Sequence, residues 1–129
     1  MPWQGDGLEL FIEKVWERAA GWTRNGVQYG FCPDTGGDGG KARFVVAWGD
    51  TAGSGRISAA WRKSANGYAL EAFIPAKSLG AKALTAGTTW GFNLSRDDDG
   101  RAVEQFFSDK EKDQGFITPV LWGAVTLAP

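Results

Sequence analysis

Residues 57–74 read ISAAWRKSANGYALEAFI, and in this stretch two runs of alternating apolar and polar residues flank Asn66-Gly67. An Asn-Gly pair between two such runs is the strongest short-range signal for a β-hairpin. Pro75 follows directly and ends the second run, because proline has no N–H to donate to a sheet. The stretch therefore predicts two antiparallel strands, over 57–63 and 68–74.

The same alternation recurs near the start of the chain, where residues 7–13 read GLELFIE. Three aliphatic residues, beginning with Leu8, alternate with Glu9, Phe11 and Glu13. Successive side chains of a strand point to opposite faces of a sheet. The segment is thus predicted to be a half-buried strand with its aliphatic side in the core.

The remaining chain is divided into short runs by turn signals, and its 19 glycines favour many turns over long helices. Strands are predicted at residues 25–32, 44–48, 88–95, 103–108 and 123–127. Loops or turns are predicted at 33–40 and 96–101 and a short helical turn at 76–84, whereas 14–24 fits either a helical turn or a loop. Together these elements predict one all-β domain over 1–129, an antiparallel β-sandwich of jelly-roll or immunoglobulin-like type.

The chain contains no histidine and one cysteine, Cys32. It therefore lacks the usual general base near neutral pH and the commonest transition-metal ligand. Nucleophile systems that depend on Ser-His-Asp or Cys-His are excluded. Carboxylate chemistry is the form of catalysis that remains.

Charge and hydropathy exclude two classes of partner. The formal net charge is −1 and the basic residues are scattered, so a nucleic-acid partner is not expected. No apolar run approaches ~20 residues, so no membrane-spanning segment is expected. Met1-Pro2-Trp3 enters a strand-like pattern at once, so no signal peptide is expected at this start.

The seven tryptophans exceed what a core of this size needs, which predicts that some rings lie at the surface and contact a ligand.

Four segments resemble the family 9 carbohydrate-binding modules, which are attached to xylanases and related secreted enzymes. They are PWQGDGLELFIE at 2–13, GYALEAFIP at 67–75, GFNL at 91–94 with the acidic turn from Asp97, and FITPVLWGAVTL at 116–127. The resemblance implies a non-catalytic β-sandwich that binds cellulose- or xylan-type glycans or their chain ends, as an accessory module of a secreted protein. Residues around 33–56 fit the family pattern poorly and are interpreted as a loop insertion.

The resemblance also implies which residues bind the sugar. In the family two aromatic rings clamp the sugar, and by motif these fall on Trp3 and Phe116, with phenylalanine in place of the usual tryptophan. Glu9 matches the acidic acceptor of sugar hydroxyls. The alternatives are a terminal ring packed on its own sheet for Trp3, a core anchor for Phe116 and a solvated strand face for Glu9.

One part of the family pattern is missing. Gly30 and Cys32 stand where sugar-binding relatives carry an Arg and an Asn, which removes hydrogen-bonding capacity. Gln28, Asp113 and Gln114 are the candidates that compensate for this loss.

Calcium is the cofactor that the chain suggests. Asp97, Asp98 and Asp99 are consecutive on a predicted turn, and Ca²⁺ prefers such hard oxygen ligands. Family members commonly hold structural calcium, and Asp6 is a further candidate ligand. The alternative is a solvated acidic turn.

Family members usually carry about one more pair of strands ahead of the segment at which this chain begins. An open sheet edge is a template for pairing, so a homodimer or strand exchange is one interpretation.

Two other functions compete with sugar binding. One is a structural or protein-interaction sandwich that has lost its ligand. The other is a glycosidase that uses two carboxylates, for instance Glu9 and Glu71, which would have to lie ~5 to ~10 Å apart across a cleft.

Overall fold

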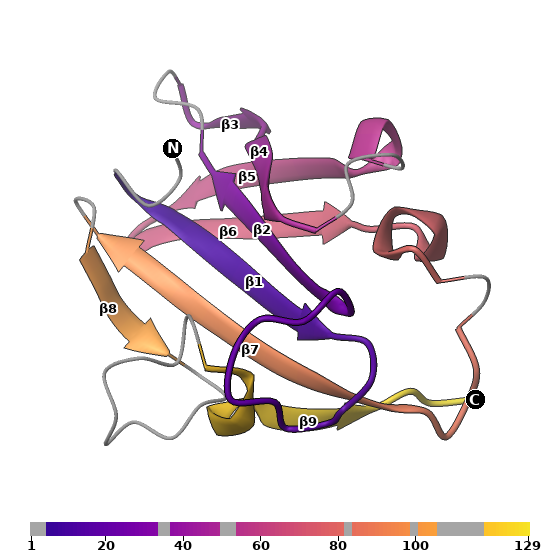
Figure 1. Cartoon of the computed structure of the whole chain (residues 1–129). Helices are drawn as coiled ribbons and strands as arrows, with labels where there is room; N and C mark the ends of the chain where they lie inside the picture. Colours follow the sequence, from indigo (N-terminus) through magenta and orange to yellow (C-terminus); the bar gives the residue numbers. More distant parts are fainter. Residues whose placement is uncertain (1–4, 34–36, 50–53, 82–83, 99–100, 106–117) are drawn as a thin grey trace.

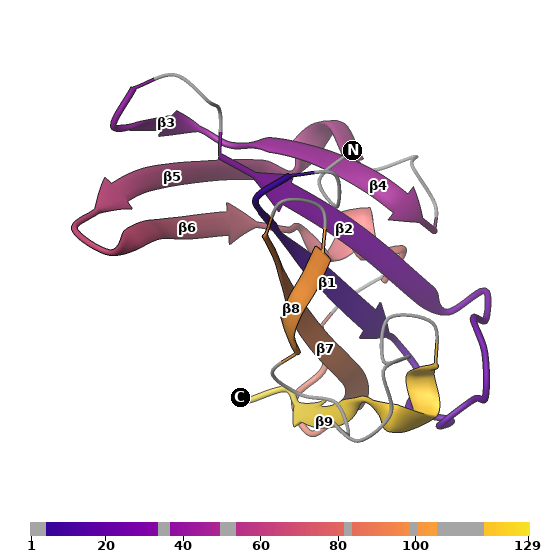
Figure 2. The same ribbon diagram turned by 90° about the vertical axis from the view of Figure 1, so that its left-hand side faces the viewer.

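The computed structural model describes residues 5–33, 37–49, 54–81, 84–98, 101–105 and 118–129. Within these ranges the chain forms two antiparallel β-sheets and three single turns of 3-10 helix. The sheets face each other, and in both views the strands of one run at an angle to those of the other (Figures 1 and 2). The predicted all-β antiparallel sandwich is confirmed.

The larger sheet has six strands, of which β1 and β7 lie at its centre. The order is β4-β2-β1-β7-β8, and β9 also pairs with β7. β8 pairs with the last residues of β7 and β9 pairs with its first residues, so both lie along the same side of one long strand. The bounds are β1 Gly7–Glu13, β2 Gly26–Cys32, β4 Arg43–Trp48, β7 Thr89–Asp98, β8 Arg101–Gln105 and β9 Gly123–Thr126.

The smaller sheet has the order β3-β5-β6, with β3 at Gly39–Lys41, β5 at Ser58–Ser64 and β6 at Gly67–Phe73. β5 and β6 form the predicted hairpin, in register from Ser58 opposite Phe73 to Ser64 opposite Gly67. The two residues between the strands make the turn. The signal at 57–74 was therefore correct in both position and type.

Two local predictions were wrong. Residues 33–40 were predicted to be a loop, but Gly39 and Gly40 belong to β3, because they pair with Arg62 and Trp61 of β5. Residues 96–101 were predicted to be a turn, but β7 continues to Asp98, since its last residues pair with β1 and β8 at once. Pairing partners distant in the sequence overrode the local turn signal in both cases.

One other expectation, for the segment after β6, is met. The short helical turn expected within 76–84 is the 3-10 helix Ala76–Leu79; the other two are Ser54–Arg56 and Pro119–Leu121. The described part of the segment interpreted as an insertion contributes β3 and β4, and β4 is an edge strand of the larger sheet. No helix in the described part of the chain is long and apolar enough to cross a membrane.

The core lies between the two sheets, and strand alternation decides which residues enter it. Ile12 of β1 packs there, whereas Phe11 belongs to the opposite face of the sheet. The buried core residues are Ile12, Val27, Tyr29, Phe31, Ile57, Leu79 and Trp90. The Tyr29 hydroxyl donates to the Ser78 carbonyl at 2.8 Å, which satisfies the polar end of this buried ring. The aliphatic side of 7–13 is thus the core side, as predicted.

Candidate functional site

The face of the larger sheet that points away from the core carries a continuous set of polar side chains. Residues directly opposite each other in an antiparallel pair share a face. Glu9 lies opposite Ser95, Phe11 lies opposite both Gln28 and Asn93, and Gly7 lies opposite Asp97. Glu9, Gln28, Asn93, Ser95 and Asp97 therefore share one face, and we call them the polar row.

Four residues of the polar row are buried even though they lie outside the core, and the fifth, Gln28, is half-buried. Glu9 is 5% exposed, Asp97 is 3% exposed and Asn93 and Ser95 are fully buried. Buried polar groups require hydrogen-bond partners. Gln28 Nε2 donates to Glu9 Oε1 at 2.7 Å, which fixes the orientation of the Glu9 carboxyl group. The alternative of a solvated strand face for Glu9 is therefore wrong.

Glu9 and Asp97 form a pair of interacting carboxyl groups. The pKa of Glu9 is raised to about 7, chiefly by burial; the charge and hydrogen bonding of Asp97 add to this rise, and the hydrogen bond from the Gln28 amide opposes it. The pKa of Asp97 is raised to about 6, chiefly by burial, against the opposing effect of its hydrogen bond with Glu9. Two like charges in one buried site disfavour simultaneous ionisation. Near neutral pH the pair thus retains a proton for part of the time.

The carboxyl pair predicts that the fold is more stable in mild acid. Both pKa values lie above the ordinary 4.5 and 3.8, so the folded chain binds these protons more tightly than the unfolded chain. Their contribution to the free energy of unfolding is complete below about pH 4 and is lost as the pH rises through 6 and 7. We expect the guanidinium chloride midpoint to be lower at pH 8 than at pH 5. Replacing Glu9 with Gln should reduce this difference between the two midpoints. An unchanged difference would contradict the raised pKa of Glu9.

The hydroxyl group of Ser95 is a further polar group on this face. Its Oγ is buried and has no hydrogen-bond partner among the described residues. It lies directly opposite Glu9 across the β1–β7 pair. A hydroxyl group that reached this position could interact with both the serine and the carboxyl pair.

An aromatic cluster continues the same face beside the polar row. It consists of Phe11, Trp22, Trp48 and Trp122. The Trp22 ring is the centre, with ring centroids 6.1 Å from Phe11, 5.6 Å from Trp48 and 5.3 Å from Trp122. Phe11 and Trp122 are buried, whereas 48% of Trp48 is exposed. The cluster thus has a buried base and one open ring.

The segment between β1 and β2 holds Trp22 in place. It is a loop rather than a helical turn, which settles the alternative left open for residues 14–24. The Val120 amide donates to the Ala19 carbonyl at 2.8 Å, and Arg18 Nη2 donates to the Val120 carbonyl at 3.1 Å. In Figure 1 the loop lies beside β9 and the turn before it. The loop therefore folds across this face of the larger sheet and is held by hydrogen bonds to Val120, in the turn before β9.

Two contacts bring the Trp22 ring onto the sheet itself. The Thr23 hydroxyl donates to the buried carboxylate of Glu13. A Cβ atom at Gly26 would lie 2.8 Å from Trp22 Cε3, so a side chain there would displace the indole. The absence of a side chain at Gly26 lets the ring sit directly on β2.

The structure brings together only some of the predicted site residues. Glu9 and Gln28 are in contact, and their ligand roles stay predictions. Trp3, Phe116, Asp113, Gln114 and Asp99 lie outside the described residues, so their predicted roles stay predictions.

The predicted calcium ligands Asp97 and Asp98 lie in a strand, not on a turn, and have different surroundings. Asp97 belongs to the polar row, whereas Asp98 forms an ion pair with Arg96 at 3.9 Å. Asp97 and Asp98 are neighbours in β7 and point to opposite faces. Among the described residues no three metal-ligating side chains gather, and Asp6 joins no such group. Calcium binding stays a prediction.

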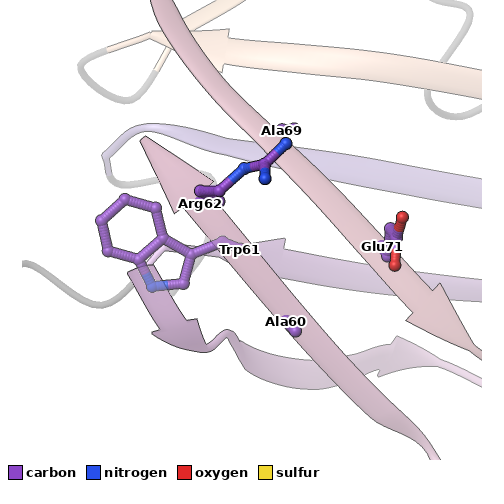
Figure 3. A pocket seen from close by; sticks show the side chains of 5 residues that line it. All are labelled: Ala60, Trp61, Arg62, Ala69 and Glu71. Carbon is purple, nitrogen blue, oxygen red and sulfur yellow. The ribbon is translucent and has the colours of Figure 1, made fainter. Parts of the chain in front are cut away.

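A shallow hollow of about 270 Å³ lies on the smaller sheet, lined by Ala60, Trp61, Arg62, Ala69 and Glu71 (Figure 3). Ala60 lies opposite Glu71, and Arg62 lies opposite Ala69. Glu71 and Glu9 thus belong to different sheets, and Glu9 lies on the face of its sheet that points away from the other. The glycosidase interpretation is therefore wrong for this pair, because the two carboxylates do not flank a common cleft.

Sequence reasoning missed three members of the polar row. Asn93 and Ser95 were not considered, and Asp97 was assigned to a turn. A signal was present, because Asn93, Ser95 and Asp97 alternate with Phe92, Leu94 and Arg96. Extending the predicted strand by three residues would have placed all three on one face of one strand, whereas their position beside Glu9 follows only from the pairing of β7 with β1.

The chain is an antiparallel β-sandwich that carries a polar row and an aromatic cluster on one face. A family model described as "Carbohydrate family 9 binding domain-like" matches residues 1–129. The chain therefore belongs to the family 9 carbohydrate-binding modules, as the four sequence segments suggested. A comparison with curated proteins found no match.

Two solved structures of a family 9 carbohydrate-binding module from Caldicellulosiruptor kristjanssonii share this fold. One, in complex with cellotriose, has a TM-score of 0.71 and 21% identity and matches 99% of this chain and 60% of its own. The other, in complex with glucose, has a TM-score of 0.72 and 23% identity and matches 98% and 61%. The present chain thus spans about 60% of the length of these relatives.

Proposed function

We propose that this domain binds carbohydrate without transforming it, at the face that carries the polar row and the aromatic cluster. The ligand class is a cellulose- or xylan-type glycan or its chain end. Family membership supports the class of ligand, and the contacts of the buried Glu9 with Gln28 and Asp97 support the place. The domain would serve as an accessory module of a secreted polysaccharide-active protein.

The polar row suits the rim of a sugar ring. Adjacent sugar hydroxyls both donate and accept hydrogen bonds, and a fixed carboxyl group can accept from two of them. Gln28 holds the Glu9 carboxyl group in one orientation. Ser95 Oγ offers a further buried position without a partner among the described residues. These groups would give direction and selectivity to the binding.

Aromatic rings would supply the apolar part of the binding. Removing the C–H face of a sugar from water against a flat ring is favourable in proportion to the area buried. The proposal retains Trp3 and Phe116 as the clamp, and it takes Gln28, Asp113 and Gln114 as compensation for the missing Arg and Asn.

Isothermal titration calorimetry with glucose, cellobiose, xylobiose and soluble xylan tests this proposal. We expect saturable heat with at least one of these ligands and a dissociation constant on the order of micromolar to millimolar, because the interface is small and wet. If folded protein gave no binding heat with any of these ligands, the result would favour a structural or protein-interaction sandwich that has lost its ligand.

The edge of the smaller sheet supports self-association as a further part of the proposal. Among the described residues β6 pairs only with β5, so its other edge is open to a partner strand. Two β6 strands paired antiparallel about Leu70 would place Ala69 opposite Glu71 of the second copy. Arg62 lies beside Ala69 and would then lie near that carboxylate.

Light scattering after size-exclusion chromatography tests the dimer. The expected mass is twice the 13.9 kDa of the chain. Replacing Glu71 with Lys would put like charges near Arg62 and should shift the population toward monomer. A wild-type monomer at all concentrations up to the millimolar range would contradict the dimer.

A further inference from the structure

Trp48 is an exposed aromatic ring on the face that carries the polar row. It is the last residue of β4, at the edge of the larger sheet. Its pairing with Gln28 and its contact with Trp22 place the ring on this face. At 48% exposure, a large part of its apolar surface is open to a ligand.

One side of the Trp48 ring is packed against another ring. Its centroid lies 5.6 Å from that of Trp22, with an angle of 35° between the planes. Trp22 is in turn packed against the buried rings of Phe11 and Trp122. A ring held on one side loses little conformational entropy when a ligand covers the other side. Trp48 is thus arranged in advance as a platform.

The backbone also holds Trp48 at the edge. Gly49 follows it with φ of 104°, a conformation that favours glycine. A Cβ atom at Gly49 would lie 2.7 Å from Val27 Cγ1 in the core. The chain can therefore leave the sheet directly after Trp48 only because residue 49 has no side chain.

Trp48 lies beside the polar row, on the strand that pairs with the strand of Gln28. Gln28 lies opposite Trp48 in β4 and donates to Glu9 in β1. From β1 to β4 is two strand spacings, or about 10 Å. That is longer than one sugar ring, so a ligand that contacts both Glu9 and Trp48 has more than one sugar residue.

We propose that Trp48 forms a second sugar subsite, which stacks on a neighbouring residue of an oligosaccharide whose end lies at the polar row. The inference rests on the proposed function and adds chain-length selectivity to it. Neither Trp3 nor Phe116 is needed for this subsite. The ligand is an oligosaccharide of two or more residues with an apolar ring face exposed for stacking.

Titration calorimetry with glucose and with cellotriose tests the subsite in wild type and in Trp48→Ala. The variant should bind cellotriose about threefold to tenfold more weakly, which corresponds to one aromatic contact. Its affinity for glucose should be unchanged. Trp48→Phe keeps a ring and should recover part of the loss. Phe73→Ala is the matched control, because Phe73 is 66% exposed on the smaller sheet and should affect neither ligand.

The outcomes separate the subsite from the proposed function. An unchanged cellotriose affinity in Trp48→Ala, or equal losses for both sugars, would overturn the subsite while leaving sugar binding intact. No binding of any sugar by folded wild-type protein would overturn the proposed function and the subsite with it. Circular dichroism on each variant establishes that the fold is retained.

Discussion

Glu9→Gln is expected to weaken sugar binding at pH 8 by about tenfold to a hundredfold. Hydrogen bonds to charged groups contribute roughly 1.5–3 kcal/mol, and the substitution removes the charge but keeps the shape. The pKa of Glu9 is about 7, so the wild-type side chain is mostly ionised at pH 8. Gln28 can still donate to the new amide oxygen, and the new amide can donate to Asp97. Calorimetry with the ligand that wild type binds best measures the loss.

The same side chain predicts how binding depends on pH. In wild type the affinity should fall from pH 8 to pH 5, because Glu9 takes up a proton over this range and becomes a weaker acceptor. Asp97, with its pKa of about 6, titrates over the same range. Glu9→Gln should show a smaller pH dependence. Equal affinities of wild type and Glu9→Gln at pH 8 would show that Glu9 does not contact the sugar.

Phe11→Ala is expected to lower the free energy of unfolding by about 3–5 kcal/mol. Phe11 is fully buried and contacts both Trp22 and Trp122, so its removal leaves a cavity in the buried part of the aromatic cluster. A loss of this size is a large part of the stability of a small domain. Guanidinium chloride unfolding, followed by tryptophan fluorescence and by circular dichroism, measures it.

Phe73→Ala again provides the control, since an exposed phenylalanine should change the free energy of unfolding by no more than about 0.5 kcal/mol. If Phe11→Ala behaved like Phe73→Ala, the ring would not be part of a packed cluster. The loop that carries Trp22 would then have to be held mainly by its hydrogen bonds with Val120 and Glu13.

The sequence predicted best those elements whose signals are local. The alternation at 7–13 placed Phe11 and Glu9 on one face and the aliphatic side in the core, and the structure agrees. The Asn-Gly pair located the β5–β6 hairpin. Both signals depend on the two-residue period of a strand, which a sequence shows directly.

The polar row could not be assembled in the same way. Asp97 looks like part of an acidic turn, and only its pairing with Gly7 extends β7 far enough to bring it to Glu9. That pairing joins segments about ninety residues apart, and alternation within one strand does not show which strands are neighbours.

The aromatic cluster was missed for a different reason. Trp22 lies in a loop without periodicity, so the sequence did not decide between the core and a binding surface. Its position depends on hydrogen bonds between its loop and Val120 and on the close approach at Gly26. Trp48 was equally undecided, and its exposure follows from its place at the sheet edge.

A titration of ¹⁵N-labelled protein with cellobiose, followed by nuclear magnetic resonance, tests the location of sugar binding most directly. We expect saturable shifts at the Gln28 side-chain amide, the Asn93 and Ser95 backbone amides and the Trp48 indole N–H. Signals from Ala60, Arg62 and Glu71 on the smaller sheet should stay in place. Shifts confined to the smaller sheet, or no shifts at saturating sugar, would contradict a binding site at the polar row.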